Sequence, residues 1–272
     1  MRTRKPPPNP DTPSSTSPLP QPSPARHTLR RAAHEFGLTG LLLFLVVTAM
    51  RWLLAPDSPI AIGNRDLAPA VLGALVGALL TALILSPSGR YSGGHLNPAV
   101  TVALWLLGAF PGRAVLPYIA AQATGALAGT ALGGLVWGAA ARHAPIAYSA
   151  VAPAPTWNAA AVLTAEAGAI VVVTLMLGAF LRRPASLRLL PYAVGLATAL
   201  IIASLGPRSG GSANPARQFG PALLSGNTTD LWIYLLAPVI GAFIGAGLWH
   251  ALAAPARRAR TRHAPGTGSG SG

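Results

Sequence analysis

The chain has 272 residues, of which 51% are hydrophobic and only 10% carry a charge. A soluble domain usually carries about 25% charged residues, so the composition excludes an ordinary soluble protein and indicates a membrane protein. The formal net charge of +14 does not indicate a nucleic-acid partner, because the basic residues flank apolar stretches and do not alternate with aromatic residues. The absence of cysteine excludes disulfides, thiol nucleophiles and thiolate metal sites.

The two ends of the chain differ from its apolar centre. Residues 1–31 are rich in Pro and Ser and lack the apolar content for a core, so we predict a disordered cytosolic tail. The apolar stretch behind them is long enough to span a bilayer, which argues against a cleaved signal peptide. Residues 254–272 are basic and end in Gly and Ser, which predicts a flexible cytosolic tail. The membrane domain is therefore expected at residues 32–253.

Six apolar stretches in this domain are long enough to cross a membrane as helices, since about 20 residues are needed. They lie at about 35–54, 67–85, 114–140, 159–181, 188–205 and 231–253. Two further apolar stretches, 98–108 and 215–224, are too short to span. Each of these begins at an Asn-Pro-Ala sequence, and Pro suits the first turn of a helix. We therefore predict an all-α membrane protein with six transmembrane helices and two re-entrant half-helices.

The distribution of Arg and Lys predicts the orientation, because cytoplasmic connections carry an excess of both. With the N-terminus in the cytosol, 15 of the 20 basic residues fall on the cytosolic side. The other side holds Arg51, Arg65, Arg142, Arg208 and Arg217. We therefore predict a multi-pass protein of the plasma membrane with both termini cytoplasmic.

An internal repeat relates the two halves of the domain. Residues 92–100 and 209–217 are identical at six of nine positions, at an offset of 117. Nearby glycines at small-xxx-small spacing, which permits close helix packing, also repeat: Gly125 and Gly129 match Gly241 and Gly245. Three spans and one half-helix in each half force the second half to enter from the opposite face. We predict an inverted repeat, with repeat one at residues 32–140 and repeat two at residues 158–253.

The Gly-rich segments in front of the half-helices are predicted to line a pore. Non-helical backbone at membrane depth is tolerated only where protein buries it or water bathes it. We expect the carbonyls of these segments to form a ladder of acceptors along a water-filled path. The ladder residues are Gly93, Gly94, His95, Gly210 and Ser212.

The two asparagines mark the point where the half-helices would meet. Asn97 and Asn214 stand at the N-caps, where the side-chain oxygen accepts from the free N–H groups and the amide NH₂ can donate into the pore. Two positive helix ends that face one midplane point disfavour any cation there, including a hydrated proton. The arrangement favours neutral solutes.

Three polar residues within the spans are expected to support these segments. Glu35 and Glu166 are the acidic residues inside spans, and they occupy corresponding places in the two repeats. A catalytic or proton-relay role is the alternative, but we expect each carboxylate to hold the irregular loop of its own repeat through backbone N–H groups. Gln122 in the third span is expected to brace the same region.

Two charged or titratable residues stand beside the motifs. Arg217 directly follows the second Asn-Pro-Ala on the outer side, where a fixed positive charge excludes cations and supplies donors. The alternative is a surface arginine that contacts lipid headgroups or a loop. His95 either lines the inner mouth and titrates near neutral pH or is a structural histidine.

With these paired motifs, the sequence resembles the aquaporin and glycerol-facilitator family over about residues 32–253. The resemblance implies an aquaporin-like channel domain, usually a homotetramer with one pore in each subunit. It implies that the central constriction is formed by Asn97, Pro98, Ala99, Asn214, Pro215 and Ala216. It also implies that Arg217 belongs to an outer selectivity filter.

The other filter positions follow from counting back from the asparagines. The fifth-span position is Ile202 and the loop position is Gly211. The second-span position is Gly77, or Val76 if the connection before the first motif is one residue longer than usual. Ile202 departs from the His that is typical of strict water channels, which indicates a wider and more apolar filter.

Two further departures leave the solute open. Glycerol facilitators commonly carry Asp after the filter Arg, and here the residue is Gln218. In the last span, Tyr234-Leu235 fits neither the water-channel nor the glycerol-channel pattern.

We therefore predict a passive channel for water and possibly other small neutral solutes, embedded in a lipid bilayer. The alternatives are a glycerol, polyol or metalloid-acid facilitator and, from another class, a non-conducting membrane scaffold. Neither a catalytic Ser-His-Asp set nor a metal-binding motif occurs in the sequence. We predict no enzyme activity, no cofactor, no metal and no nucleic-acid partner.

Overall fold

The computed structural model describes the backbone of residues 24–262 and the side chains of residues 24–253. Six helices in this part are long and apolar enough to cross a membrane. They are α1 (Pro24–Leu54), α2 (Leu67–Leu85), α5 (Val115–Trp137), α7 (Ala159–Leu181), α8 (Leu190–Leu205) and α10 (Leu231–Arg262). Together with two short helices inside the bundle, they confirm the predicted all-α membrane fold of the aquaporin type.

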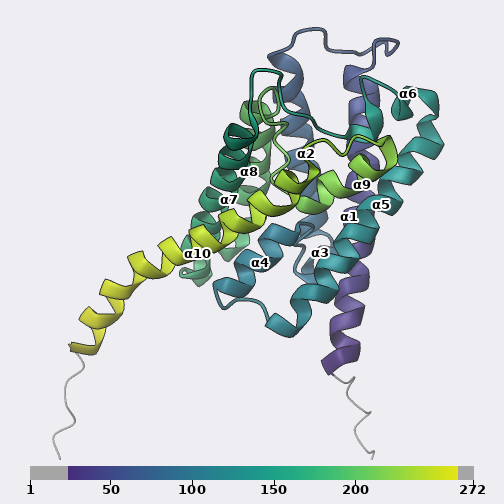
Figure 1. Ribbon diagram of the computed structural model, residues 1–272. Coiled ribbons are helices and arrows are strands. Elements are labelled where there is room, and N and C mark those ends of the chain that lie inside the picture. Colours follow the sequence, from purple (N-terminus) through teal and green to yellow (C-terminus); the bar gives the residue numbers. More distant parts are fainter. Residues whose placement is uncertain (1–23, 263–272) are drawn as a thin grey trace, which may run out of the picture.

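The two half-helices are α4 (Pro98–Leu106) and α9 (Pro215–Ser225). Figure 1 shows α4 in the half of the molecule where α1 begins and α10 ends, and α9 in the opposite half. The two helices therefore enter the bundle from opposite faces, as an inverted repeat requires. The remaining helices are short connections: α3 (Pro87–Ser92), α6 (Ala139–Arg142) and 3₁₀ turns at Gly112–Ala114, Ala147–Ser149 and Pro184–Leu189.

The helical ends extend further than the sequence predicts. Helix α1 begins at Pro24, so residues 24–31 are helical and do not belong to the predicted tail. Proline suits the first helical turn, and Arg31 Nε donates to the Tyr91 carbonyl at 2.9 Å, which ties this extension to the connection before α4. Helix α10 continues to Arg262, beyond the predicted end of the membrane domain at residue 253. The rest of both predicted tails lies outside the described residues.

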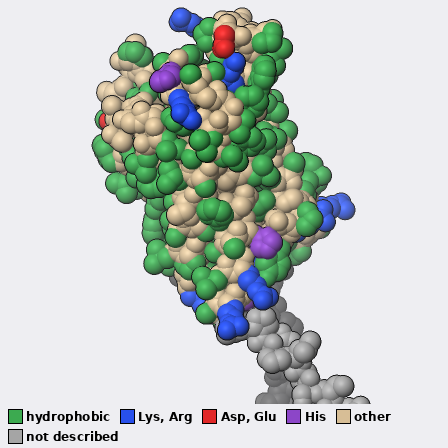
Figure 2. Space-filling model, turned by 90° about the vertical axis from the view of Figure 1, so that its right-hand side faces the viewer, with side chains coloured by type: hydrophobic (Ala, Val, Ile, Leu, Met, Phe, Trp, Pro, Cys, Tyr) green, Lys and Arg blue, Asp and Glu red, His purple; other side chains and the backbone are tan. Residues whose placement is uncertain are grey.

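The outer surface of the bundle is apolar. Large side chains that point away from the core include Leu116 at 75%, Leu135 at 70% and Val172 at 66% exposure. Figure 2 shows hydrophobic side chains across the middle of one face, with Lys and Arg gathered mostly toward the two ends. Such a band matches the hydrocarbon layer of a bilayer flanked by its headgroup regions.

The long helices pack in pairs that follow the repeat: α1 lies along α5, α7 lies along α10, and α2 lies along α8. Glycine permits these approaches. A Cβ on Gly129 would lie 1.8 Å from the Gly40 carbonyl oxygen on α1, and a Cβ on Gly241 would lie 2.2 Å from the Ala167 carbonyl oxygen on α7. The predicted small-residue rows therefore serve helix packing.

We expect Gly129→Ala to lower the thermal stability of the protein in detergent, because the new methyl group meets backbone that cannot move aside. The cost should be about 1–3 kcal/mol, as for overpacked cores. Gly168→Ala on α7 is the matched control, since nothing lies within 4 Å of a Cβ there. Equal melting temperatures for the two variants would contradict the assigned packing role of Gly129.

Candidate functional site

The N-termini of α4 and α9 are capped by the two predicted asparagines. Asn97 Oδ1 accepts from Ala99 N at 2.8 Å. Asn214 Oδ1 accepts from Ala216 N at 3.0 Å and from Arg217 N at 3.3 Å. These contacts fix the orientation of each side-chain amide, so that its NH₂ group points away from its own helix.

Each of these amides also binds the other repeat. Asn97 Nδ2 donates to the Ala213 carbonyl at 2.9 Å, and Asn214 Nδ2 donates to the Leu96 carbonyl at 2.9 Å. An NH₂ group has two hydrogens, so one N–H of each asparagine remains to donate to a solute. The sequence predicted the capping role but not this exchange between the halves.

The residues before the asparagines adopt unusual backbone conformations. Leu96 has φ 49° and Ala213 has φ 46°, in the left-handed region that non-glycine residues rarely occupy. Such residues cost free energy and persist only where their surroundings impose them. Here the conformation turns each carbonyl toward the asparagine of the opposite repeat.

Two buried carboxylates impose this conformation, as the sequence predicted. Glu166 Oε1 accepts from Ser209 Oγ at 2.7 Å and from Ser212 N at 3.1 Å, and Oε2 accepts from Ala213 N at 2.5 Å. The Glu166 side chain therefore satisfies two backbone donors and one hydroxyl in front of α9.

Glu35 repeats the arrangement in front of α4. It accepts from Ser92 Oγ at 2.7 Å, His95 N at 3.0 Å and Leu96 N at 2.8 Å. Gln122 Nε2 adds a fourth bond to Glu35 Oε2 at 2.9 Å. The bracing predicted for Glu35, Glu166 and Gln122 is present in the hydrogen bonds of the structure.

Two tyrosines brace the same loops and were missed by the sequence reasoning. Tyr118 Oη donates to the Ser92 carbonyl at 2.6 Å, and Tyr234 Oη donates to the Ser209 carbonyl at 2.5 Å. Both rings are fully buried. The two residues are 116 positions apart, as are the repeated glycines. Extending the repeat alignment along the third and sixth spans would have found them.

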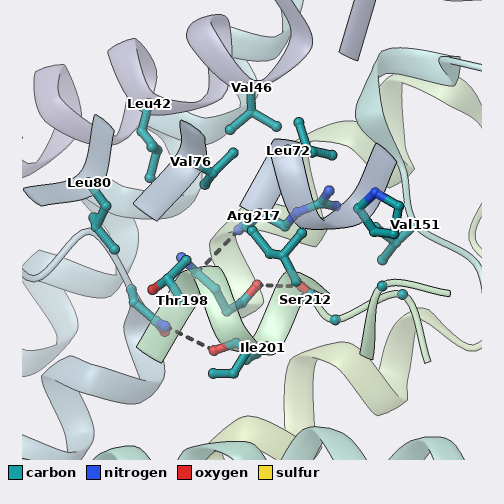
Figure 3. Close-up of a pocket in the computed structure, with 18 of the residues that line it drawn as sticks. Leu42, Val46, Leu72, Val76, Leu80, Val151, Thr198, Ile201, Ser212 and Arg217 are labelled. Carbon is teal, nitrogen blue, oxygen red and sulfur yellow. Dashed lines mark hydrogen bonds between the residues drawn. The ribbon is translucent and has the colours of Figure 1, made fainter. Parts of the chain in front are cut away.

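A cavity of about 300 Å³ runs along the two loops. Helix α2 lines it from Ala68 to Leu80, which corresponds to about 18 Å at 1.5 Å per residue. Figure 3 shows Leu42, Val46, Leu72, Val76 and Leu80 on one side, with Thr198, Ile201 and Ser212 across from them. The loop residues that line the cavity are His95, Leu96, Asn97, Gly210, Gly211, Ser212, Ala213 and Asn214. One wall is thus apolar and the other carries polar groups.

The structure distinguishes the two candidates for the second-span filter position. Val76 lines the cavity, whereas Gly77 does not. Gly77 faces α8 instead, where its Cβ would lie 2.4 Å from the Gly195 carbonyl oxygen. Ile202, Gly211 and Arg217 all line the cavity.

The predicted carbonyl ladder is only partly placed at the cavity. His95, Gly210 and Ser212 line it, but Gly93 and Gly94 do not. Gly93 ends α3 with φ 106° and is exposed, and the buried Gly94 has its missing Cβ directed at Ile84. Their place in the carbonyl ladder stays a prediction.

Arg217 is held by a connection between the two repeats. Its Nη1 donates to the Ser149 carbonyl at 2.9 Å and to Gln218 Oε1 at 3.4 Å. The buried Gln218 in turn accepts from Val151 N at 3.0 Å and donates to the Val151 carbonyl at 2.9 Å. Arg217 also lines the cavity. The sequence showed no signal for Ser149 or Val151.

His95 also lines the cavity and is almost fully buried. Its Nδ1 lies 3.1 Å from Thr101 Oγ1. The ring packs against Phe110 and Tyr118, with centroid distances of 4.7 and 5.1 Å. His95 therefore has both a structural partner and access to the cavity.

We expect Glu166→Gln to destabilise the protein by on the order of 3 kcal/mol, because the amide NH₂ would face backbone donors. Denaturant unfolding in detergent micelles would measure this loss. Tyr234→Phe is the control, since it removes one bond to the same loop and should cost only about 1 kcal/mol. If both variants lost the same stability, the carboxylate would not be the dominant brace.

Comparison with known proteins places this site in a family. The model of the family described as "Major intrinsic protein" matches residues 24–249. The probable aquaporin AqpM of Archaeoglobus fulgidus is 39% identical over 184 residues, 65% of this chain and 74% of the relative. Aquaporin NIP3-1 of Oryza sativa is 34% identical over 233 residues, which are 85% of this chain and 70% of the relative.

The chain is also similar to a solute facilitator and to a channel of known structure. The propanediol uptake facilitator PduF of Citrobacter freundii is 32% identical over 253 residues, covering 80% of this chain and 90% of the relative. The X-ray structure of the aquaglyceroporin from Plasmodium falciparum shares the fold, with a TM-score of 0.69 at 23% identity over 84% of this chain and 98% of that one.

Within the described residues no cluster of His, Asp or Glu could hold a metal ion. The chain belongs to the major intrinsic protein family, whose members are passive membrane channels for water and small neutral solutes and are not enzymes.

Proposed function

We propose that the chain forms a passive pore for water that also admits small neutral solutes and rejects protons and other ions. The observation that carries the proposal is the cavity between the two half-helices, with one apolar wall and one wall of loop carbonyls and asparagine amides. Water can keep its hydrogen bonds along the polar wall, while the apolar wall offers no competing partner. An ion would lose its hydration shell there without full replacement.

The central constriction is proposed to lie at the Asn-Pro-Ala pair. The spare N–H groups of Asn97 and Asn214 both donate to an oxygen between them, which turns the hydrogens of that water away from the centre. The N-termini of α4 and α9 add a partial positive charge of about half a unit each. A proton would have to pass both, so the arrangement favours exclusion of cations.

The outer filter is proposed to consist of Val76, Ile202, Gly211 and Arg217. Arg217 supplies the fixed charge and the donors. Ile202 and Val76 supply apolar walls, and Gly211 adds no side chain, so the opening suits a solute wider than water. The relative PduF is named a propanediol uptake facilitator, which supports a neutral-solute range of this kind.

The orientation and assembly are part of the proposal. The first residues of α1 and the end of α10 lie on the same side of the molecule (Figure 1), which fits two cytoplasmic termini. The excess of Arg and Lys on that side supports an orientation with the Arg217 end outward, and we propose the plasma membrane as the location. A homotetramer with one pore in each subunit is the expected assembly.

The alternative functions differ in which solutes cross the membrane through the protein. A facilitator of glycerol, polyols or metalloid acids would use the same filter with little water flux, and a non-conducting scaffold would pass nothing. Stopped-flow light scattering on proteoliposomes separates these possibilities. We expect fast, weakly temperature-dependent shrinkage in a sucrose gradient and measurable re-swelling in glycerol. Proteoliposomes that respond like empty ones to both gradients would overturn the pore proposal.

We expect Arg217→Val to keep water flux and to raise proton leak, because the fixed charge at the filter is lost. Two unit charges about 4 Å apart interact by about 1 kcal/mol in bulk water and about 4 kcal/mol near a protein surface, so the leak should rise by about fivefold or more. A pH-sensitive dye inside the vesicles would measure it. Arg208→Val is the matched control, since Arg208 does not line the cavity and its Nη1 binds the Ser204 carbonyl. An unchanged leak would remove Arg217 from the exclusion mechanism.

A further inference from the structure

The helices that line the cavity contribute one hydroxyl group to it. Helices α1, α2, α4, α7 and α8 all line the cavity. Of the described residues that they contribute, Thr198 is the one whose side chain carries a hydroxyl, an amide or a charge. The other lining positions of α8 are Val194, Ile201 and Ile202. A hydroxyl at this position can contact a solute in the cavity.

The Thr198 hydroxyl offers an acceptor to the cavity. Its Oγ1 donates to the Val194 carbonyl at 3.0 Å, which uses its one hydrogen. A hydroxyl oxygen retains lone pairs that accept. Asn97 and Asn214 present spare donors from the polar wall. The cavity therefore offers both an acceptor and donors to a solute.

Thr198 lies deeper in the cavity than the proposed filter. It is one helical turn before Ile202 on α8, or about 6 Å along the axis. In the view of Figure 3 it lies between the α2 side chains Val76 and Leu80 and the loop that carries Ser212. A solute that has passed Ile202 would meet this hydroxyl next.

We propose that Thr198 forms a hydrogen-bonding subsite for small solutes with hydroxyls on neighbouring carbons. One hydroxyl donates to Thr198 Oγ1, a neighbouring hydroxyl accepts from an asparagine amide, and the carbon skeleton lies against Val and Ile side chains. Without Thr198, a hydroxyl directed at this position would lose its partner, which is costly in a narrow pore where the solute leaves little room for water. Water depends less on Thr198 because the loop wall alone can bind it. This inference rests on the proposed pore and names its solute class.

The hydroxyl of Thr198 is not required by its own helix. Thr124 on α5 and Thr164 on α7 make the same bond to the carbonyl four residues earlier, and both are exposed on the outside of the bundle. The bond is therefore the ordinary local hydrogen bond that a threonine makes in a helix, and it does not depend on tertiary contacts. Replacing Thr198 with the isosteric Val should leave the fold intact, which makes the substitution a clean test.

The test measures water, glycerol and 1,2-propanediol permeability in proteoliposomes by stopped-flow light scattering. The proteins are the wild type, Thr198→Val, Thr198→Ser and the control Thr164→Val. We expect Thr198→Val to lower both diol permeabilities roughly two- to tenfold, the effect of one lost neutral hydrogen bond, with little change for water. Thr198→Ser should retain diol permeability, and Thr164→Val should match the wild type.

Several outcomes would overturn the subsite. A glycerol-to-water ratio that Thr198→Val leaves unchanged would show that the hydroxyl does not serve diols. An equal loss of water and diol permeability in Thr198→Val would assign it a structural role instead. A wild type that passes water but neither diol would overturn this inference and leave the proposed pore standing. A wild type that passes none of the three would overturn the pore, and the subsite with it.

Discussion

The irregular backbone in front of α4 and α9 depends on two carboxylates that the chain buries completely, Glu35 and Glu166. Polar backbone at membrane depth must find partners inside the protein or in water. The carbonyls of Leu96 and Ala213 turn toward the centre, so the N–H groups of these residues need acceptors on the other side. The carboxylates supply them, and hydrogen bonds to a charged group are the strongest that a side chain can offer. Their burial is costly, and the bonds they accept offset that cost.

Reciprocal bonds between the repeats follow from this bracing. Each carboxylate fixes the loop of its own repeat, and each loop places a carbonyl that accepts from the asparagine of the other repeat. The position of Asn97 thus depends on Glu166 through Ala213, and the position of Asn214 depends on Glu35 through Leu96. Neither repeat contains a complete centre, since each provides an amide and needs a carbonyl from its partner.

Much of this architecture could be predicted from the sequence because duplication makes weak signals specific. One Asn-Pro-Ala is a common helix start, but two copies at an offset of 117, each behind Ser-Gly-Gly, determine the topology. The loop-bracing residues could be predicted because a buried carboxylate in an apolar span needs donors, and the loops contain them.

The features that could not be predicted are those that sequence spacing does not resolve. Val76 and Gly77 are neighbours on a helix and face directions about 100° apart, so an uncertainty of one residue in the connection decides between cavity and helix contact. The Gly-rich sequence likewise does not show where the chain meets the cavity, which His95 lines and the preceding Gly93 and Gly94 do not. Ser149 and Val151 lie in an irregular connection and bind Arg217 and Gln218 through backbone groups, for which no side-chain pattern exists.

The two ends of the cavity differ because the repeats differ outside their shared core. The position of His95 in repeat one is Ser212 in repeat two, and Thr101 corresponds to Gln218. In repeat one these residues form an internal network, in which Thr101 contacts both His95 and Gln122. In repeat two, Gln218 reaches outward and joins the connection that also holds Arg217. The shared residues build a centre that is equivalent from both sides, so any preference among neutral solutes must come from residues that the duplication does not repeat.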